Sequence, residues 1–204
     1  MLGRFIYPFF DEFRQGHSQN MGDVYKPAED SYLLLRHVEA RVHGRVLDMG
    51  TGSGILAIAA ARKPDVSEVV VIDINPDSVE MARLKAKDSG LLGKMDFRVG
   101  DLFEGLDEES FDWIVFNPPY LPSEGNFDEP SWSGGKTGSE VVSRFLREAP
   151  AHLKSYGSIL IVFSTLTGLS LNDFKESFEV EVLEELPLFF ETLTCLLLRP
   201  SSHL

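Results

Sequence analysis

The tetrapeptide Asn117-Pro118-Pro119-Tyr120 carries the clearest chemical signal in the sequence. It follows an apolar run at 111–116 that has the length and the β-branched and aromatic content of a buried strand. The two prolines favour extended backbone and have no N–H, so the corner is stiff and no local donor competes for its acceptors. Such a corner can hold a planar amino group: the Asn117 side-chain oxygen and the Pro118 carbonyl each accept one N–H, and Tyr120 packs over the plane. Taken alone, the motif also fits a proline-rich turn that leaves a strand, because four residues are a short signal.

A glycine-rich loop lies upstream, between a predicted strand at 45–49 and a predicted helix at 55–62. Strand, glycine loop and helix form the first βα unit of a nucleotide-type fold. A dinucleotide loop would read G-x-G-x-x-G, but position 55 is Ile, which argues against a dehydrogenase. The G-x-G-x-G pattern, preceded by Asp48, instead resembles the S-adenosylmethionine loop of class I methyltransferases. In that family the glycines let the backbone approach the methionine and ribose parts of the cofactor, and the acid lies where the ammonium group sits. The glycines here are Gly50, Gly52 and Gly54.

Two further predicted strands also lead into acidic residues. The apolar run at 68–72 ends at Asp73, where a carboxylate can accept both ribose hydroxyls of an adenosine. The strand at 95–99 leads to Asp101 and Leu102, whose carboxylate and backbone N–H suit the amino group and a ring nitrogen of adenine. Asp73 could instead cap the following helix, and Asp101 could be an ordinary turn acid. Together with the strand at 111–116, which leads to Asn117, three successive strands end in a polar residue. Because ligands of open α/β sheets bind at the carboxyl ends of the strands, these endings predict a ligand site there.

The remaining pattern predicts the rest of an α/β domain. We expect a Rossmann-like class I methyltransferase fold: a seven-stranded, mostly parallel sheet with the last strand antiparallel and helices on both faces. Residues 1–24 are expected to form an N-terminal arm and 25–204 a single methyltransferase domain. The long polar loop at 121–139 is interpreted as a substrate-binding flap, with Trp132 as its anchor. The other expected elements are helices at about 32–42, 76–89, 140–153 and 171–178, and strands at 159–163, 180–186 and 192–198.

Composition limits the classes of function. The formal net charge of −13 repels a phosphate backbone, so nucleic acid is disfavoured as the main partner. No apolar run approaches the roughly 20 residues that span a membrane, and the N-terminus lacks a secretory signal, so we expect a cytoplasmic protein without membrane contact. The single cysteine, Cys195, excludes an internal disulfide and a cysteine-cluster zinc site, and we expect no metal ligands.

In this order, the motifs resemble those of the HemK-related protein glutamine methyltransferases, in the archaeal and eukaryotic branch that modifies class 1 translation release factors. The resemblance spans about residues 22 to 198. The segments that carry it are 24–31, 48–54, 73–76, 117–120 and 132–138, with a closing strand at 191–193.

The resemblance implies an activity and a set of partners. The cofactor would be S-adenosylmethionine, and the substrate would be the glutamine of the Gly-Gly-Gln loop of a release factor. Members of this branch lack the helical domain that precedes the catalytic domain in bacteria, and they depend on a small zinc-binding activator protein, so a heterodimer is implied. Tyr25 and the stretch that ends at Ser31 would cover the methionine part of the cofactor. Ser31 stands where the family often has Thr and keeps the hydroxyl.

The expected mechanism follows from the weakness of a carboxamide nitrogen as a nucleophile. Asn117 and the Pro118 carbonyl would accept both N–H bonds, which orients the nitrogen and favours localisation of its lone pair. The proton can leave after methyl transfer, so no general base is required. Three alternatives remain open: an amino methyltransferase that acts on a nucleic-acid base, one that acts on another protein side chain such as lysine, and a scaffold that binds the cofactor without catalysis.

Overall fold

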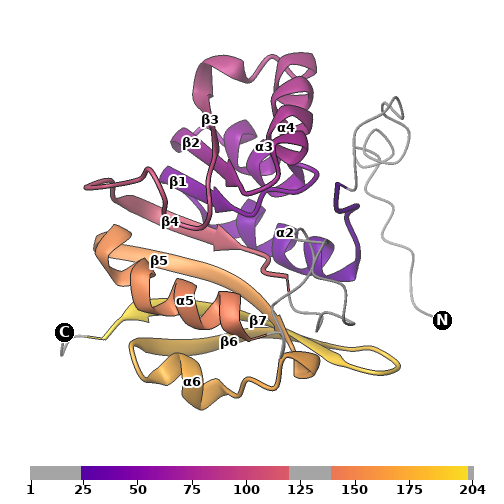
Figure 1. Ribbon diagram of the computed structural model, residues 1–204, viewed down its shortest axis with the longest axis vertical. Helices are drawn as coiled ribbons and strands as arrows, with labels where there is room; N and C mark the ends of the chain where they lie inside the picture. The colour runs from indigo at the N-terminus through magenta and orange to yellow at the C-terminus, as the bar shows by residue number, and fades with distance from the viewer. Residues whose placement is uncertain (1–23, 120–138, 202–204) are drawn as a thin grey trace.

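The computed structural model of the chain describes residues 24–119 and 139–201. Within these residues, seven strands form one sheet in the order β3-β2-β1-β4-β5-β7-β6 (Figure 1). β1 to β5 pair in parallel, and β7 runs antiparallel between β5 and β6, which confirms the predicted fold class. The strands are β1 (Gly44–Met49), β2 (Val66–Asp73), β3 (Met95–Val99), β4 (Phe111–Phe116), β5 (Leu153–Ser164), β6 (Phe178–Pro187) and β7 (Thr192–Pro200). The division into an arm at 1–24 and a domain at 25–204 stays a prediction, because residues 1–23 lie outside the described part.

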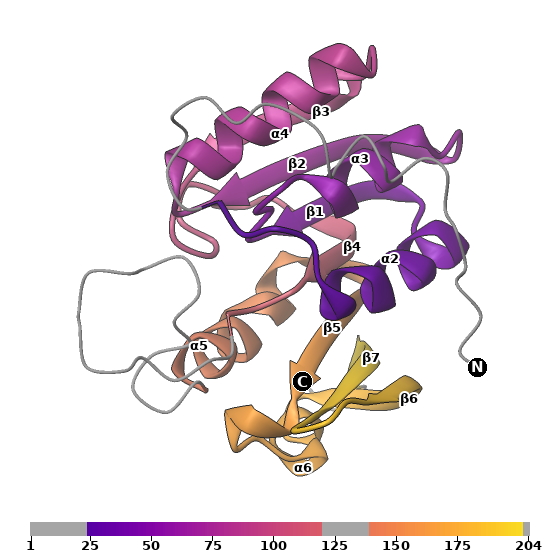
Figure 2. The same ribbon diagram turned by 90° about the vertical axis from the view of Figure 1, so that its right-hand side faces the viewer.

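Helices cover both faces of this sheet (Figures 1 and 2). α2, α3 and α4 contribute to the hydrophobic core on one face, and α5 and α6 contribute to the core on the other. The α-helices are α2 (Glu29–Arg41), α3 (Ile55–Arg62), α4 (Pro76–Asp88), α5 (Glu140–Glu148) and α6 (Leu171–Lys175). The described residues also contain three short 3₁₀ helices between these elements, η2 (Leu92–Lys94), η3 (Ala149–His152) and η4 (Thr165–Thr167).

Strand β2 shows why the central strands are apolar over most of their length. Val69 and Val71 belong to the core under α2, α3 and α4, whereas Val70 and Ile72 belong to the core under α5. All four side chains are fully buried. The part of a strand that is covered on both faces has no solvent-facing position, so after Glu68 the next polar side chain of β2 is Asp73, at its carboxyl end.

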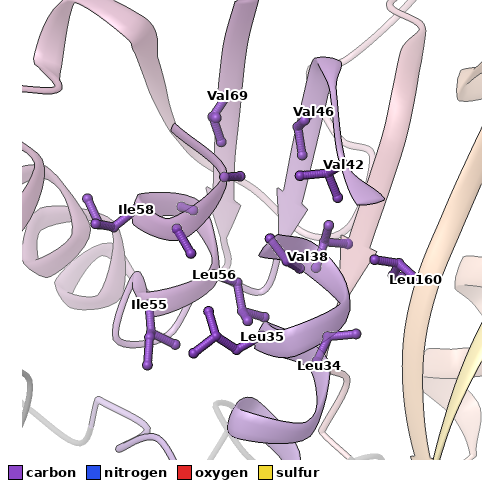
Figure 3. Packing of buried hydrophobic residues seen from close by; sticks show 14 of the residues in the cluster. Leu34, Leu35, Val38, Val42, Val46, Ile55, Leu56, Ile58, Val69 and Leu160 are labelled. Atoms are coloured by element: carbon purple, nitrogen blue, oxygen red, sulfur yellow. The ribbon is translucent and has the colours of Figure 1, made fainter. Parts of the chain in front are cut away.

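The packing of α2 on α3 determines where the start of α2 lies at the edge of the sheet. Figure 3 shows Leu35 and Val38 of α2 beside Leu56 of α3, on the same side of the sheet as Val46 of β1. All four belong to one buried cluster. This contact places the first turn of α2 next to the loop that precedes α3.

Three predicted boundaries in the second half of the chain are wrong. The helix predicted to reach Leu153 ends at Glu148, because Pro150 has no N–H to continue it, and a 3₁₀ turn follows. Strand β5 then begins at Leu153, six residues before the predicted start. Its first half carries exposed polar residues at 154–156, so this part of the strand does not form the apolar run by which strands are predicted. The last helix also ends earlier than predicted, at Lys175, since β6 begins at Phe178.

Gly54 is required where α3 meets α4. Its φ is +79°, and a Cβ built on it would lie 2.9 Å from both the Cα and the Cβ of Ala82 in α4. Gly90 has a similar φ of +70°, but a Cβ built on it would meet no other described atom within 4 Å. Alanine substitutions at these two glycines therefore distinguish the cost of backbone strain alone from the cost of strain together with a steric clash.

We expect Gly54→Ala to lower the free energy of unfolding by about 2–4 kcal/mol, the sum of left-handed backbone strain and overpacking. Gly90→Ala should lower it by only about 1 kcal/mol, because strain alone acts there. Urea unfolding of both variants measures the difference. Equal losses in the two variants would contradict the close approach of α3 and α4.

Candidate active site

A cavity opens at the carboxyl edge of the sheet, where β1, β2 and β4 end and α2 begins. Most of the predicted site residues form its wall: Tyr25, Ser31, Gly50, Gly52, Asp73, Asp101, Leu102, Asn117, Pro118 and Pro119. Asp48 and Gly54 belong to the same loop region but not to the wall. Tyr120 and Trp132 lie outside the described residues, so their roles stay predictions.

Asp73 fastens the glycine loop to the end of β2. Its Oδ2 accepts a hydrogen bond from the Gly52 N–H, and its Oδ1 accepts one from the Asn75 N–H, both at 2.9 Å. Burial raises the pKa of Asp73, and these two backbone hydrogen bonds partly offset that rise. Each carboxylate oxygen can accept a second hydrogen bond, so Asp73 can hold the loop and still receive donors from the cavity.

Asp48 is a fully buried carboxylate at the end of β1. Its Oδ2 accepts a hydrogen bond of 2.6 Å from the Thr51 hydroxyl, while its Oδ1 has no hydrogen-bond partner among the described residues. Burial raises the pKa of Asp48 to about 7, with a further upward contribution from the negative charge of Asp73. A positive charge bound near the loop would stabilise the ionised form of Asp48.

Asp30 connects the N-terminal motif to the cavity. Its Oδ2 accepts a hydrogen bond of 2.8 Å from the Tyr25 hydroxyl. Its Oδ1 accepts from the backbone N–H of Ser31 and, at 3.1 Å, from the Ser31 hydroxyl. Sequence analysis missed this role, since an acid in the first turn of a helix is already explained by the helix dipole. The buried Asp30 thus orients both Tyr25 and Ser31 in the wall of the cavity.

The side chain of Asn117 is oriented by this same network. Its Nδ2 donates to the Ser31 hydroxyl oxygen at 3.4 Å, a long hydrogen bond. Its Oδ1 is buried and has no partner within the described part of the chain. A buried acceptor without a donor is destabilising unless a ligand supplies one. Asn117 therefore presents an acceptor to whatever enters the cavity beside it.

The predicted adenine end differs from expectation in one respect. The Asp101 carboxylate already pairs with Arg144 of α5, with 2.9 Å between Asp101 Oδ2 and Arg144 Nη2. Both side chains are about 40% exposed, so the pair leaves the carboxylate accessible to a further donor. Leu102 has a φ of +52° although it is not glycine, and its side chain is buried. Strained backbone of this kind concentrates at functional sites, which agrees with the predicted use of the Leu102 N–H.

Lys85 is a second residue that sequence analysis missed. It extends from α4, and its Nζ donates a hydrogen bond of 2.8 Å to the carbonyl of Ser53 in the glycine loop. Burial lowers the pKa of Lys85 to about 8. An amphipathic helix carries many lysines on its solvent face, so nothing in the sequence distinguishes this one.

Other chemistries find little support in the described residues. No cluster of three or more His, Cys, Asp and Glu residues suited to a metal ion occurs there. Cys195 is buried, and burial raises the pKa of its thiol to about 12, so it is not an activated nucleophile. No helix in residues 24–119 or 139–201 is long and apolar enough to span a membrane.

The arrangement fits S-adenosylmethionine. Two buried carboxylates with raised pKa values favour a ligand that carries positive charge, and Asp73 suits ribose hydroxyls. The left-handed glycines keep side chains off the loop backbone, and the nearest neighbour of a Cβ built on Gly52 is Tyr25, at 3.6 Å. The Oδ1 of Asn117, which is buried and has no hydrogen-bond partner in the described residues, remains as an acceptor for a second molecule at the same edge.

Comparisons with known proteins agree with this site. The family model described as Methyltransferase small domain matches residues 26–185. A Methanocaldococcus jannaschii protein, provisionally named a protein N5-glutamine methyltransferase, is 39% identical over 84% of this chain and 89% of its own length. Human methyltransferase HEMK2 is 32% identical over 78% of each chain.

Bacterial and structural relatives extend the comparison. The release factor glutamine methyltransferase of Rhodopirellula baltica is 30% identical, but the match covers only 59% of this chain and 45% of that protein. The solved complex of Mtq2 and Trm112 from E. cuniculi, described as responsible for methylation of the termination factor eRF1, matches with a TM-score of 0.69. That match is 26% identical and covers 87% of this chain and 98% of the other.

The matched family covers the glycine loop, the acids that follow β2 and β3, and the Asn117 corner that together form the cavity. The chain therefore belongs to the methyltransferase small domain family and is a methyltransferase that uses S-adenosylmethionine.

Proposed function

We propose that this enzyme methylates the side-chain amide nitrogen of a glutamine in the Gly-Gly-Gln loop of a class 1 translation release factor. The observation that carries the proposal is the buried Oδ1 of Asn117, which has no partner among the described residues and is held in place through Ser31. A carboxamide has two N–H donors in one plane, which is what such an acceptor requires. A lysine side chain is tetrahedral at nitrogen and matches this corner less well. The names of the relatives support the same substrate class.

In this mechanism the chain's own residues mainly orient the amide. S-Adenosylmethionine supplies an electrophilic methyl group when it is bound. Asn117 Oδ1 and the Pro118 carbonyl accept the two amide N–H bonds, and their dipoles stabilise the positive charge that develops on nitrogen. The amide nitrogen gains the methyl group and loses one proton to solvent. Tyr120 and Trp132 complete the proposed substrate contacts, Tyr120 over the amide plane and Trp132 from the loop that follows.

The proposal includes a small, zinc-binding activator protein as a heterodimer partner and a cytoplasmic location, where release factors act. Two strands form the edges of the sheet, and they differ. The edge strand β6 exposes Val182 at 42%, but it also carries the exposed Glu179, Glu181 and Glu185, which oppose pairing with another chain. At and near β3, by contrast, four large apolar side chains are between 37% and 58% exposed: Ile74, Leu84, Leu92 and Val99. An exposed apolar edge of this kind supports a partner at β3.

A methyl-transfer assay with labelled S-adenosylmethionine tests the substrate. We expect label on an intact class 1 release factor, and none on the variant in which Ala replaces the glutamine of its Gly-Gly-Gln loop. A Trm112-like activator should raise the rate. Equal labelling of both factors would redirect the proposal to another side chain. Label on DNA or RNA instead would favour a nucleic-acid base, and no transfer despite bound cofactor would indicate a scaffold.

Asn117→Ala should lower the methylation rate at least about 100-fold, because a preorganised partner of the reacting group is lost. The dissociation constant for S-adenosylmethionine should change by less than about threefold. Ser31→Ala serves as the graded control, since it keeps the acceptor but removes the hydroxyl that orients it, and it should cause a smaller loss. A variant Asn117→Ala that no longer binds cofactor would show that Asn117 has a cofactor or folding role instead.

Asp48 should make cofactor binding depend on pH. Its pKa is raised to about 7 without ligand, and a positive ligand favours the carboxylate, so affinity should rise up to about tenfold per pH unit below pH 7. The same raised pKa makes the ligand-free protein lose stability as pH rises from about 4 through 7. Asp48→Asn should weaken binding and remove both trends. Calorimetric titration and urea unfolding at several pH values measure them, and unchanged pH profiles in Asp48→Asn would exclude this role.

A further inference from the structure

Two aromatic side chains at the turn between β6 and β7 are almost completely in solvent. Phe189 is 92% exposed and Phe190 is 85% exposed. Their rings form an edge-to-face pair with centroids 4.6 Å apart. Large apolar side chains that stand together in solvent mark interaction sites more often than single ones do. We call residues 188–191 the aromatic turn.

Hydrogen bonds hold the aromatic turn in one shape. The Leu188 N–H donates to the Glu191 carbonyl at 2.7 Å and closes the turn. The Thr192 N–H donates to the Thr165 hydroxyl at 3.0 Å, and the Ser164 hydroxyl donates to the Glu191 carboxylate. Leu188 itself packs against the core under α2, α3 and α4. The two rings are therefore presented outward by a turn that is fixed to the end of β5.

The aromatic turn lies on the same edge of the sheet as Asn117. β7 runs antiparallel to β5, with Leu193 opposite Ser164, so the start of β7 meets the carboxyl end of β5. β5 is also the neighbour of β4, whose carboxyl end carries Asn117. Figure 1 shows the β6–β7 hairpin extending past the sheet on the side where β4 ends. From strand spacing and rise, the turn lies two strands over, and its tip extends roughly 10–15 Å beyond the level of Asn117.

A glutamine side chain is short, so a protein that inserts one into the cavity must bring the rest of its domain over this edge. The aromatic turn stands at the distance where that domain has to pass. Its surroundings are acidic: Glu185 of β6 is exposed, and Glu191 closes the turn. The formal net charge of the chain is −13. An apolar patch with a basic rim is the surface that such a turn would complement.

We propose that the aromatic turn is a docking element for the protein substrate and receives an apolar, basic-rimmed patch on the domain that carries the methylated glutamine. This inference rests on the proposed function, since it requires a folded protein as the substrate. Its effect is on substrate affinity, because neither ring lies in the wall of the cofactor cavity.

The test is steady-state methylation of the whole release factor by a double variant, Phe189→Ala with Phe190→Ala. We expect KM for the factor to rise at least about tenfold, with kcat at saturation and the dissociation constant for S-adenosylmethionine unchanged. The matched control is Tyr156→Ala, which removes an aromatic ring that is 99% exposed from the opposite end of β5. It should leave KM unchanged. Replacing both phenylalanines by Leu should restore most of the affinity, because it keeps an apolar surface.

Different results of this experiment would contradict the docking proposal alone or the docking proposal together with the proposed function. If the wild-type enzyme methylates the factor and the double variant has the same KM, the docking proposal is wrong and the proposed function stands. If the wild-type enzyme does not methylate the factor even with a Trm112-like activator present, both fail. A fall in kcat or in cofactor affinity would show a structural effect instead. Sedimentation that detects a dimer dissolved by the double variant would assign the aromatic turn to a second copy of this chain and overturn the proposal.

Discussion

Burial of the central strands on both faces is the constraint on which the rest of the structure depends. Val69 to Ile72 have no exposed side, and the same holds for the centres of β1, β4 and β5. Polar groups are consequently confined to the ends of these strands. Because the strands are parallel, the ends that share a direction gather at one edge. The position of the cavity therefore follows from the geometry of the sheet, and the sequence determines which residues lie at the carboxyl end of each strand.

Several acids are buried together in and around the cavity, which is unfavourable in isolation. Each of the three deepest has a local donor: Asp30 accepts from Tyr25 and Ser31, Asp48 from Thr51, and Asp73 from backbone N–H groups. The compensation is incomplete, since Asp48 keeps an oxygen without a partner in the described residues. A cationic cofactor would complete it. Stability of the empty site and affinity for the cofactor are thus two parts of one electrostatic balance.

Much of the fold and part of the site could be predicted from the sequence. The apolar runs of β1, β2 and β4, the glycine loop and the Asn117 corner are local patterns with local physical causes. The role of Asp30 was missed because the helix dipole already explains an acid at that position, and its link to Asn117 runs through Ser31, which is 86 residues away from Asn117 in the sequence. Lys85 reaches the glycine loop only after α4 has docked. The first half of β5 was missed since its exposed polar residues resemble a loop. The contacts of Lys85 and Asn117 were missed because they join side chains that are far apart in the sequence, and the periodicity of apolar residues reports only local structure.

The contact between Gly54 and Ala82 has a consequence for how this sequence can change. Both positions lie where α3 and α4 cross, and neither leaves room for a larger side chain. A methyl group added at either one separates the helices, and the glycine loop moves with the start of α3. A change of residue at position 54 should therefore be accompanied by a compensating change at position 82, or neither residue should change. In a set of related sequences they would form a pair in which small residues persist, although neither touches a ligand.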